Sequence, residues 1–151
     1  DEAFERWRAV ADARGIRLTH DVDARLVAYG DATLLSRVVD NVVANAVHYN
    51  RDGGAVTVTA RLIAPADDAW APTIVTVEVS DEGAGIPADE HERIFERFFR
   101  LDESRRRHTG GSGLGLAICR EVLRALGGQI HVAGSSPAGT TFAITLPGAA
   151  R

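Results

Sequence analysis

Three segments of this 151-residue chain carry residue types that could bind a charged ligand. In the first, Asn41, Asn45 and His48 are spaced four and three residues apart, which places them on one face of a helix. This polar face interrupts a valine-rich segment, and it is either the solvent side of the helix or a binding surface. Amide oxygens can bind a hard cation such as Mg²⁺, and His48 or the adjacent Tyr49 could contact a phosphate or cover a ring.

The second segment, at residues 81–87, directly follows a predicted strand and reads DEGAGIP. Gly83 and Gly85 allow positive φ angles or a close approach of the backbone to a flat ligand. The carboxylate of Asp81 could accept a hydrogen bond from an exocyclic amine. Taken alone, the same residues are also explained by an ordinary tight turn after a strand.

The third segment, at residues 110–116, leads into a predicted helix and reads GGSGLGL. Such a loop presents backbone N–H groups and the positive end of the helix dipole to phosphate, although it could also be a hinge. It is not a P-loop, since no lysine follows the glycines, and it lacks the context of a Rossmann site. The three arginines at 105–107 are either a solvated charge run or part of a lid that contacts phosphate.

Apolar periodicity predicts the elements that must position these segments. Helices are expected over 1–14, 31–50, 89–98 and 113–126, and strands over 16–19, 25–29, 55–63, 73–80, 129–133 and 140–146. Asp31 is the predicted N-cap of the second helix, and Gly127 with Gly128 the C-terminal cap of the last. We therefore predict a two-layer α/β sandwich, with a mixed sheet of about five strands covered on one face by about three helices.

Composition narrows the functional class. A net charge of −4 argues against generic binding to nucleic acid or to an anionic membrane. One cysteine excludes an internal disulfide and fits a reducing compartment. All 17 basic residues are arginines, which excludes a mechanism that needs a lysine. With no apolar run near the roughly 18 residues of a membrane span, we expect a cytoplasmic domain, and the lack of any methionine suggests a fragment.

The order and spacing of the segments resemble the catalytic, ATP-binding domain of bacterial sensor histidine kinases, which belong to the GHKL superfamily and have the Bergerat fold. The resemblance runs from about residue 16 to residue 146. It comprises an N box at 31–50, a G1 box at 81–87, an F box at 92–100, a G2 box at 111–118 and a final glycine motif at 139–142. It implies that residues 16–151 form this domain and that 1–15 are a helical remnant of the linker from a dimerisation domain.

The resemblance implies Mg²⁺ and ATP as cofactors and gives the residues separate roles. Asp81 would accept a hydrogen bond from the adenine amino group, with Thr141 nearby and acting through water, and Asn45 would bind Mg²⁺. Phe95 and Phe98 would anchor a lid over 100–112. The expected nucleotide-binding residues are Asn41, Asn45, His48, Tyr49, Asp81, Gly83, Gly85, Ile86, Gly113, Leu114, Gly115, Leu116 and Thr141, and the catalytic candidates are Asn41, His48, Arg97 and Arg100.

The N box also separates the branches of the superfamily. Members that hydrolyse ATP carry a glutamate as general base where this chain has Asn41, and an amide cannot accept a proton. The resemblance therefore implies phosphoryl transfer to a histidine on a separate dimerisation domain, and then to an aspartate of a response regulator. The chain lacks the phosphoacceptor motif, so we expect a monomer that binds ATP without phosphorylating itself, cut from a parent anchored in the membrane.

Two alternatives stay open. A serine kinase of the anti-sigma type shares this ATP pocket, although the F box and the arginine-bearing lid favour the histidine-kinase branch. A non-catalytic docking module of the same fold would have lost the pocket, whereas Asn45, Asp81 and the glycines of both loops are present. Nucleotide binding would distinguish this module from either kinase.

Overall fold

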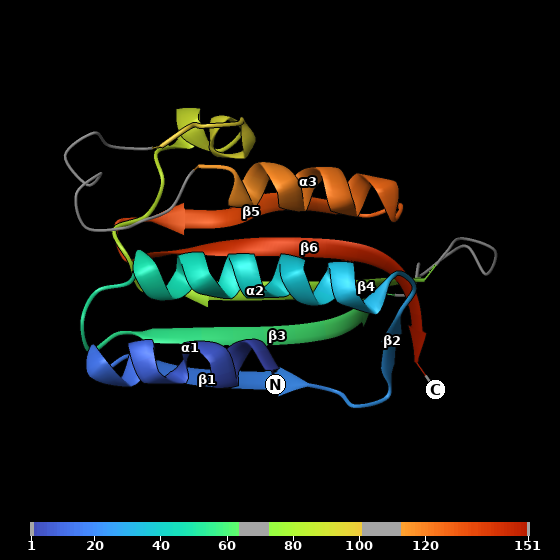
Figure 1. Cartoon of the computed structure of the whole chain (residues 1–151), viewed down its shortest axis with the longest axis horizontal. Helices are drawn as coiled ribbons and strands as arrows, with labels where there is room; N and C mark the ends of the chain where they lie inside the picture. Colours follow the sequence, from blue (N-terminus) through green and yellow to red (C-terminus); the bar gives the residue numbers. More distant parts are fainter. Residues whose placement is uncertain (1, 64–72, 101–112, 151) are drawn as a thin grey trace.

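The computed structural model describes residues 2–63, 73–100 and 113–150 (Figure 1). Its elements follow the predicted order closely. They are α1 (Glu2–Ala13), β1 (Arg17–Val22), β2 (Leu26–Ala28), α2 (Ala32–His48), β3 (Ala55–Ile63), β4 (Ile74–Asp81), the 3₁₀ turns η1 (Ala88–Glu90) and η2 (Arg93–Phe95), α3 (Gly115–Ala125), β5 (Gln129–Ser136) and β6 (Gly139–Ala150).

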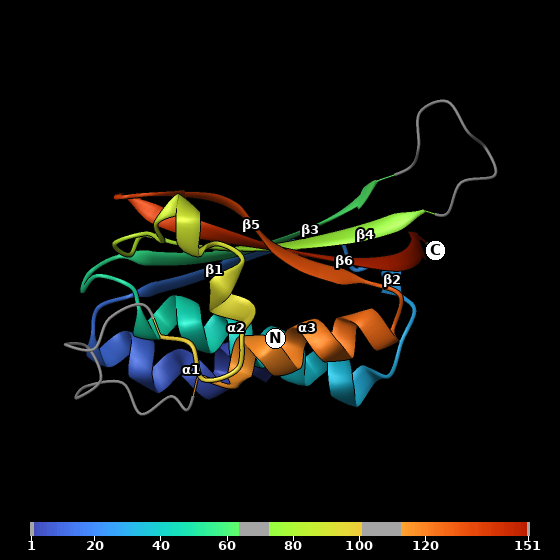
Figure 2. The same ribbon diagram turned by 90° about the horizontal axis from the view of Figure 1, so that it is seen from above.

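The described strands form one mixed sheet of six, and α1, α2 and α3 cover one of its faces (Figure 2). Across the sheet the order is β1, β3, β4, β6 and β5; only β1 and β3 run parallel. The last residues of β6 turn away and pair with β2. The predicted two-layer sandwich is confirmed. However, β1 and β2 are neighbours only in sequence, since each pairs with a different distant strand.

The helix ends form as their residues predict. Asp31 caps α2, with its side-chain oxygen accepting a hydrogen bond from the Leu34 N–H at 2.9 Å. After α3, Gly127 adopts a φ of 74°, and the Gly128 N–H donates to the Leu123 carbonyl at 2.8 Å. This is the Schellman arrangement that a glycine makes possible after a helix.

The prediction of a helix over 89–98 is wrong in kind. The segment contains the two 3₁₀ turns η1 and η2 in place of an α-helix. Ile94 and Phe95 are adjacent in sequence and both buried. Their burial does not follow the three- and four-residue spacing of an amphipathic α-helix. At Phe98 the backbone has a φ of 64°, which ends any helical geometry.

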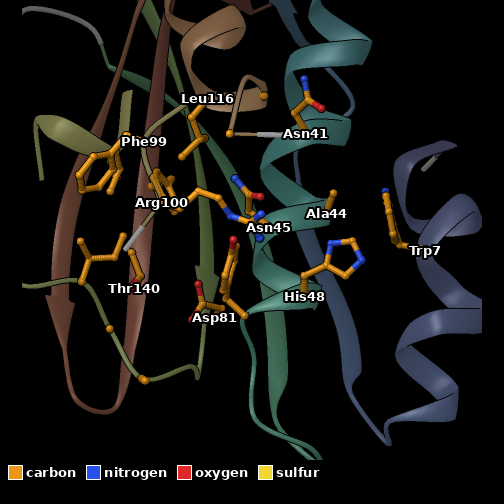
Figure 3. A pocket seen from close by; sticks show the side chains of 18 residues that line it. Trp7, Asn41, Ala44, Asn45, His48, Asp81, Phe99, Arg100, Leu116 and Thr140 are labelled. Carbon is orange, nitrogen blue, oxygen red and sulfur yellow. The ribbon is translucent and has the colours of Figure 1, made fainter. Parts of the chain in front are cut away.

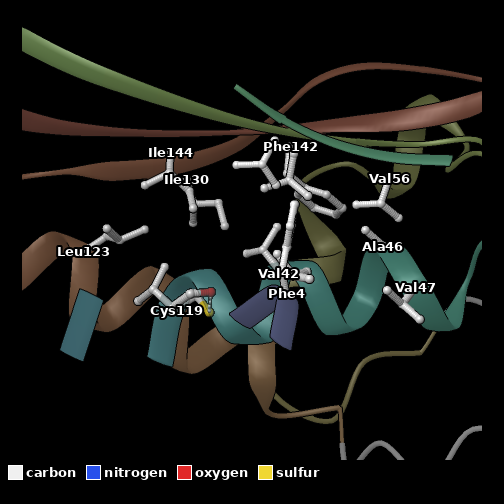
Figure 4. Close-up of a cluster of buried hydrophobic side chains, with 14 of the residues drawn as sticks. Phe4, Val42, Ala46, Val47, Val56, Cys119, Leu123, Ile130, Phe142 and Ile144 are labelled. Carbon is white, nitrogen blue, oxygen red and sulfur yellow. Dashed lines mark hydrogen bonds between the residues drawn. The ribbon is translucent and has the colours of Figure 1, made fainter. Parts of the chain in front are cut away.

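The core lies between the helices and the sheet (Figure 4). Val42 and Ala46 of α2 pack beneath Val56 and Phe142 of the strands, and all four are buried. At the other end, Cys119 and Leu123 of α3 are completely buried, and burial raises the pKa of the Cys119 thiol to about 11. Two residues of α1, Phe4 and Ala11, belong to the same core, so residues 2–13 pack as part of this domain. That they derive from a linker remains a prediction.

Candidate functional site

A cavity of about 410 Å³ lies over α2, between the turn after β4 and the start of α3 (Figure 3). It brings together residues from all the motifs found in the sequence. The expected site residues in its wall are Asn41, Asn45, His48, Tyr49, Asp81, Gly85, Ile86, Arg100, Gly113, Gly115 and Leu116. The additional lining residues are Trp7, Ala44, Ala84, Ile94, Phe99, Thr140 and Phe142.

The polar face of α2 supplies one side of this cavity. The opposite face of α2 is buried against the sheet, so the side chains of the polar face point toward the cavity. Asn41 and Asn45 therefore stand one turn apart in the wall. A Cβ atom added at Gly115 would lie 3.7 Å from the Asn41 Oδ1 atom, so the start of α3 comes close to the first amide. The Arg100 side chain reaches toward Asn45 (Figure 3).

The C-terminal end of α2 is held by Arg14, which follows α1. Its guanidinium donates hydrogen bonds to the carbonyl oxygens of Val47 and Asn50, each at 2.6 Å, and to the Asp52 carboxylate at 2.8 Å. A cation here satisfies orphan carbonyls and complements the helix dipole. Burial, and secondarily the Arg14 charge, lower the pKa of His48, which favours the neutral imidazole.

Asp81 ends β4 at the opposite side of the cavity. Its carboxylate accepts a hydrogen bond from the Gly83 N–H at 2.7 Å and another from the Thr140 backbone. Burial raises the pKa of Asp81, and these two hydrogen bonds act in the opposite direction. Gly83 is required for a further reason: a Cβ atom there would lie 2.3 Å from the Tyr49 carbonyl oxygen, so only glycine lets this turn pack against the end of α2.

The register of β6 corrects one expected position. Thr141 does not line the cavity, whereas Thr140 does. Thr140 pairs with Asp81 across the strands, and Thr141 pairs with Ser80, with 2.8 Å between the two hydroxyl oxygens. Successive residues of a strand point to opposite faces, so Thr141 points to the face without helices. The one-residue difference reverses the side chain's direction.

Other expected residues lie beside the cavity or outside the described chain. Gly83 and Leu114 do not line the cavity, and Arg97 is exposed outside it. Phe95 is buried, with its ring 6.3 Å from that of Phe142, whereas Phe98 is 72% exposed; that these residues anchor a lid stays a prediction. The expected lid, its arginines at 105–107 and the glycines at 110–111 lie outside the described residues, except for Arg100.

Besides Thr140, sequence reasoning missed Ser135 and Trp7, which contact expected site residues. Ser135 of β5 accepts a hydrogen bond from the Ile86 N–H at 2.7 Å, and its Oγ lies 3.1 Å from the Thr140 Oγ1. Its pairing with Thr140 in the predicted hairpin is the signal that could have found it. Trp7 of α1 lines the cavity beside His48. No sequence signal distinguishes this tryptophan from an ordinary apolar residue on the buried stripe of a helix.

Known proteins resemble this chain in both sequence and fold. Residues 30–150 match the family described as "Histidine kinase-, DNA gyrase B-, and HSP90-like ATPase". The chain belongs to this family, which confirms the resemblance read from the boxes. Among similar proteins, the sensor-like histidine kinase SenX3 of Mycobacterium tuberculosis is 38% identical over 146 residues, covering 97% of this chain and 34% of SenX3. Sensor histidine kinase WalK of Bacillus subtilis is 39% identical, covering 78% of this chain and 18% of WalK.

Solved structures show the same fold. The mycobacterial sensor histidine kinase MprB superposes with a TM-score of 0.78 at 33% identity, covering 99% of this chain and 95% of the MprB chain. Full-length ShkA in complex with AMPPNP gives a TM-score of 0.81 at 30% identity, covering 99% of this chain and 29% of ShkA. The chain thus spans about a third of the length of SenX3. None of the described helices is long and apolar enough to cross a membrane.

Proposed function

We propose that this chain binds Mg²⁺ and ATP in the cavity over α2 and donates the γ-phosphoryl group to a histidine of a separate domain. The observation that carries the proposal is the convergence of the N-box amides, the Asp81 turn and the glycines before α3 on a single cavity. The full-length SenX3 and WalK proteins are named as sensor kinases, and ShkA was solved with an ATP analogue, which supports the same ligand and activity here.

The adenine would lie at the Asp81 end. Asp81 is held by two backbone N–H groups, so its carboxylate keeps one direction while it accepts a hydrogen bond from the exocyclic amine. Thr140, beside it on β6, has a hydroxyl in the same wall and would take the role that the sequence suggested for Thr141. Gly85 and Ile86 form the turn against which a flat base can pack.

The triphosphate would lie along α2. Asn45 offers an amide oxygen, a hard ligand that fits Mg²⁺ when phosphate oxygens and water complete the shell. None of the described residues forms a cluster of three or more His, Cys, Asp or Glu that could hold a metal ion. When bound, the ion would neutralise triphosphate charge. Arg100, His48 and the backbone at Gly113 would contact the phosphate oxygens.

The transfer step needs positioning more than acid–base chemistry from this chain. A nitrogen of the acceptor imidazole attacks the γ-phosphorus, and the bond from that phosphorus to the β–γ bridging oxygen breaks. ADP leaves with the electron pair, and the remaining imidazole N–H proton passes to solvent. Asn41 cannot activate water as a base, so hydrolysis would be slow relative to transfer. The acceptor would belong to the dimerisation domain of the parent kinase, and a response-regulator aspartate would receive the group next.

Calorimetric titration of ATP with and without Mg²⁺ tests the binding half of this proposal. Saturable binding that depends on Mg²⁺ is expected, and no binding at millimolar ATP would contradict the proposal. The transfer half is tested by adding the parent's separately purified dimerisation domain with radiolabelled ATP. The label should appear there as an acid-labile, base-stable phosphoramidate. An acid-stable phosphoester would indicate transfer to serine and would contradict the histidine acceptor.

A further inference from the structure

The first helix contributes one side chain to the cavity wall, Trp7. The indole is held at two points on α2. Its Nε1–H donates a hydrogen bond to the Asp40 Oδ1 atom at 3.1 Å, and its ring meets the His48 imidazole edge to face, with centroids 5.0 Å apart and an interplanar angle of 79°. Asp40, Ala44 and His48 are spaced four residues apart, so the indole lies along successive turns of one helix face (Figure 3).

The Asp40 partner of Trp7 is itself held in place. The Asp40 side chain is only 20% exposed and its Oδ1 atom also accepts from the Arg6 guanidinium at 2.9 Å. Around Trp7, α1 is anchored in the core through Phe4 and Ala11. A tryptophan loses few rotatable bonds when ordered, and here packing and a hydrogen bond both order it. The contact with His48 is therefore part of the packed structure of the domain.

The chemistry of His48 explains why its orientation matters. Burial and, secondarily, the nearby Arg14 charge lower its pKa, and the charged residues Asp81 and Arg100 line the same cavity. A neutral imidazole has a single N–H donor, whereas a lysine ammonium has three on a flexible stem. A lysine could find a phosphate oxygen from many positions, but a neutral histidine must be aimed at one.

We propose that Trp7 is a positioning residue for the nucleotide: it holds the His48 ring in the orientation that lets its one N–H donate to a phosphate oxygen of ATP. This inference rests on the proposed function. The inference adds α1, which lies outside every sequence box, to the site. Trp7 then affects triphosphate binding without contacting the adenine end.

The test compares calorimetric affinities of ATP and adenosine for the wild type, Trp7→Ala, Trp7→Phe, His48→Ala and the double variant Trp7→Ala/His48→Ala. Trp7→Ala should weaken ATP by about 3- to 10-fold, the range of one aromatic pair, and leave adenosine unchanged. Trp7→Phe keeps a ring against His48 and should stay within about twofold of the wild type. In the His48→Ala background, Trp7→Ala should cause no further loss, because the two changes remove one interaction.

The matched control is Val10→Ala, which shortens an exposed apolar residue of the same helix outside the cavity and should leave both affinities unchanged. An equal loss of ATP and adenosine, or losses that add in the double variant, would overturn the inference, as would an unchanged ATP affinity in Trp7→Ala. If Trp7→Ala does not fold, Trp7→Leu decides the same question, since it keeps apolar packing without a ring. A wild type that binds no ATP would instead refute the proposed function.

Discussion

The two ends of the cavity are built in different ways. At the Asp81 end, hydrogen bonds with the backbone fix the polar groups: Asp81 with Gly83 and Thr140, and Ser135 with Ile86. At the α2 end, the polar groups are side chains standing on a helix, and side-chain neighbours such as Trp7 orient them. The first arrangement suits a flat base of one shape, whereas the second suits a charged group whose position changes during a reaction. The predictions below test this contrast.

The largest effect is expected from crowding the fixed end. Gly85 has a φ of 79°, and a Cβ atom there would lie 2.1 Å from the Ser136 carbonyl oxygen. Gly85→Ala should therefore lower the free energy of unfolding by about 2 to 4 kcal/mol, from backbone strain and overpacking together. Thermal denaturation measures this. Gly134→Ala is the control, because nothing lies within 4 Å of its added Cβ and its φ is not positive; equal effects of the two would contradict the close contact.

Asp81→Asn should be next in size. The amide can accept fewer of the hydrogen bonds that the carboxylate receives, and ATP affinity should fall about 10- to 100-fold. Calorimetry should show the same fold-loss of affinity for ATP and for adenosine, since the lost hydrogen bond is at the base. Glu82→Gln, which removes the neighbouring exposed carboxylate paired with Arg51, should leave binding unchanged. A selective loss of ATP alone would move Asp81 to the phosphate end.

At the α2 end, Asn45→Ala should remove the dependence of ATP affinity on Mg²⁺, because the helix would lose its oxygen ligand. Titrations with and without Mg²⁺ should then coincide, while adenosine affinity stays at the wild-type value. Asn45→Asp keeps an oxygen at the same place and should retain the dependence. Mg²⁺ dependence that survives in Asn45→Ala would assign the ligand elsewhere.

The smallest effect is expected for Ser135→Ala. The substitution leaves the Ile86 N–H without its acceptor. The binding free energy should therefore weaken by about 1 kcal/mol, or about fivefold in affinity, for adenosine and ATP alike. Ser136→Ala is the matched control, since that hydroxyl accepts a hydrogen bond from the Ala138 N–H in the hairpin turn. A Ser135→Ala variant with unchanged adenosine affinity would show that the turn holds its shape without this bond.

Local patterns predicted the site wherever one element carries the residues. The spacing of Asn41, Asn45 and His48 determined a helix face, and the glycines around Asp81 and Gly113 marked two turns that reach the same cavity. Such signals are short-range, because a periodicity or a turn depends on neighbouring residues.

The features that the sequence did not predict depend on contacts between segments far apart in the chain. Thr140 and Thr141 are indistinguishable until the register with β4 decides which one faces the helices. Trp7 reaches His48 only because α1 packs beside α2, and β2 finds its partner at the far end of β6. The β1–β2 turn gave no indication of that partner.

The Arg14 contacts with the end of α2 also have a consequence for folding. They join residues 33 to 38 positions apart, so they depend on the end of α1 packing against the end of α2. The end of the helix that carries His48 and Tyr49 is therefore completed only by tertiary closure. A nucleotide that binds only this closed form would stabilise the whole domain by mass action, so its melting temperature should rise with ATP concentration. Nucleotide binding and the stability of the fold would then be thermodynamically linked.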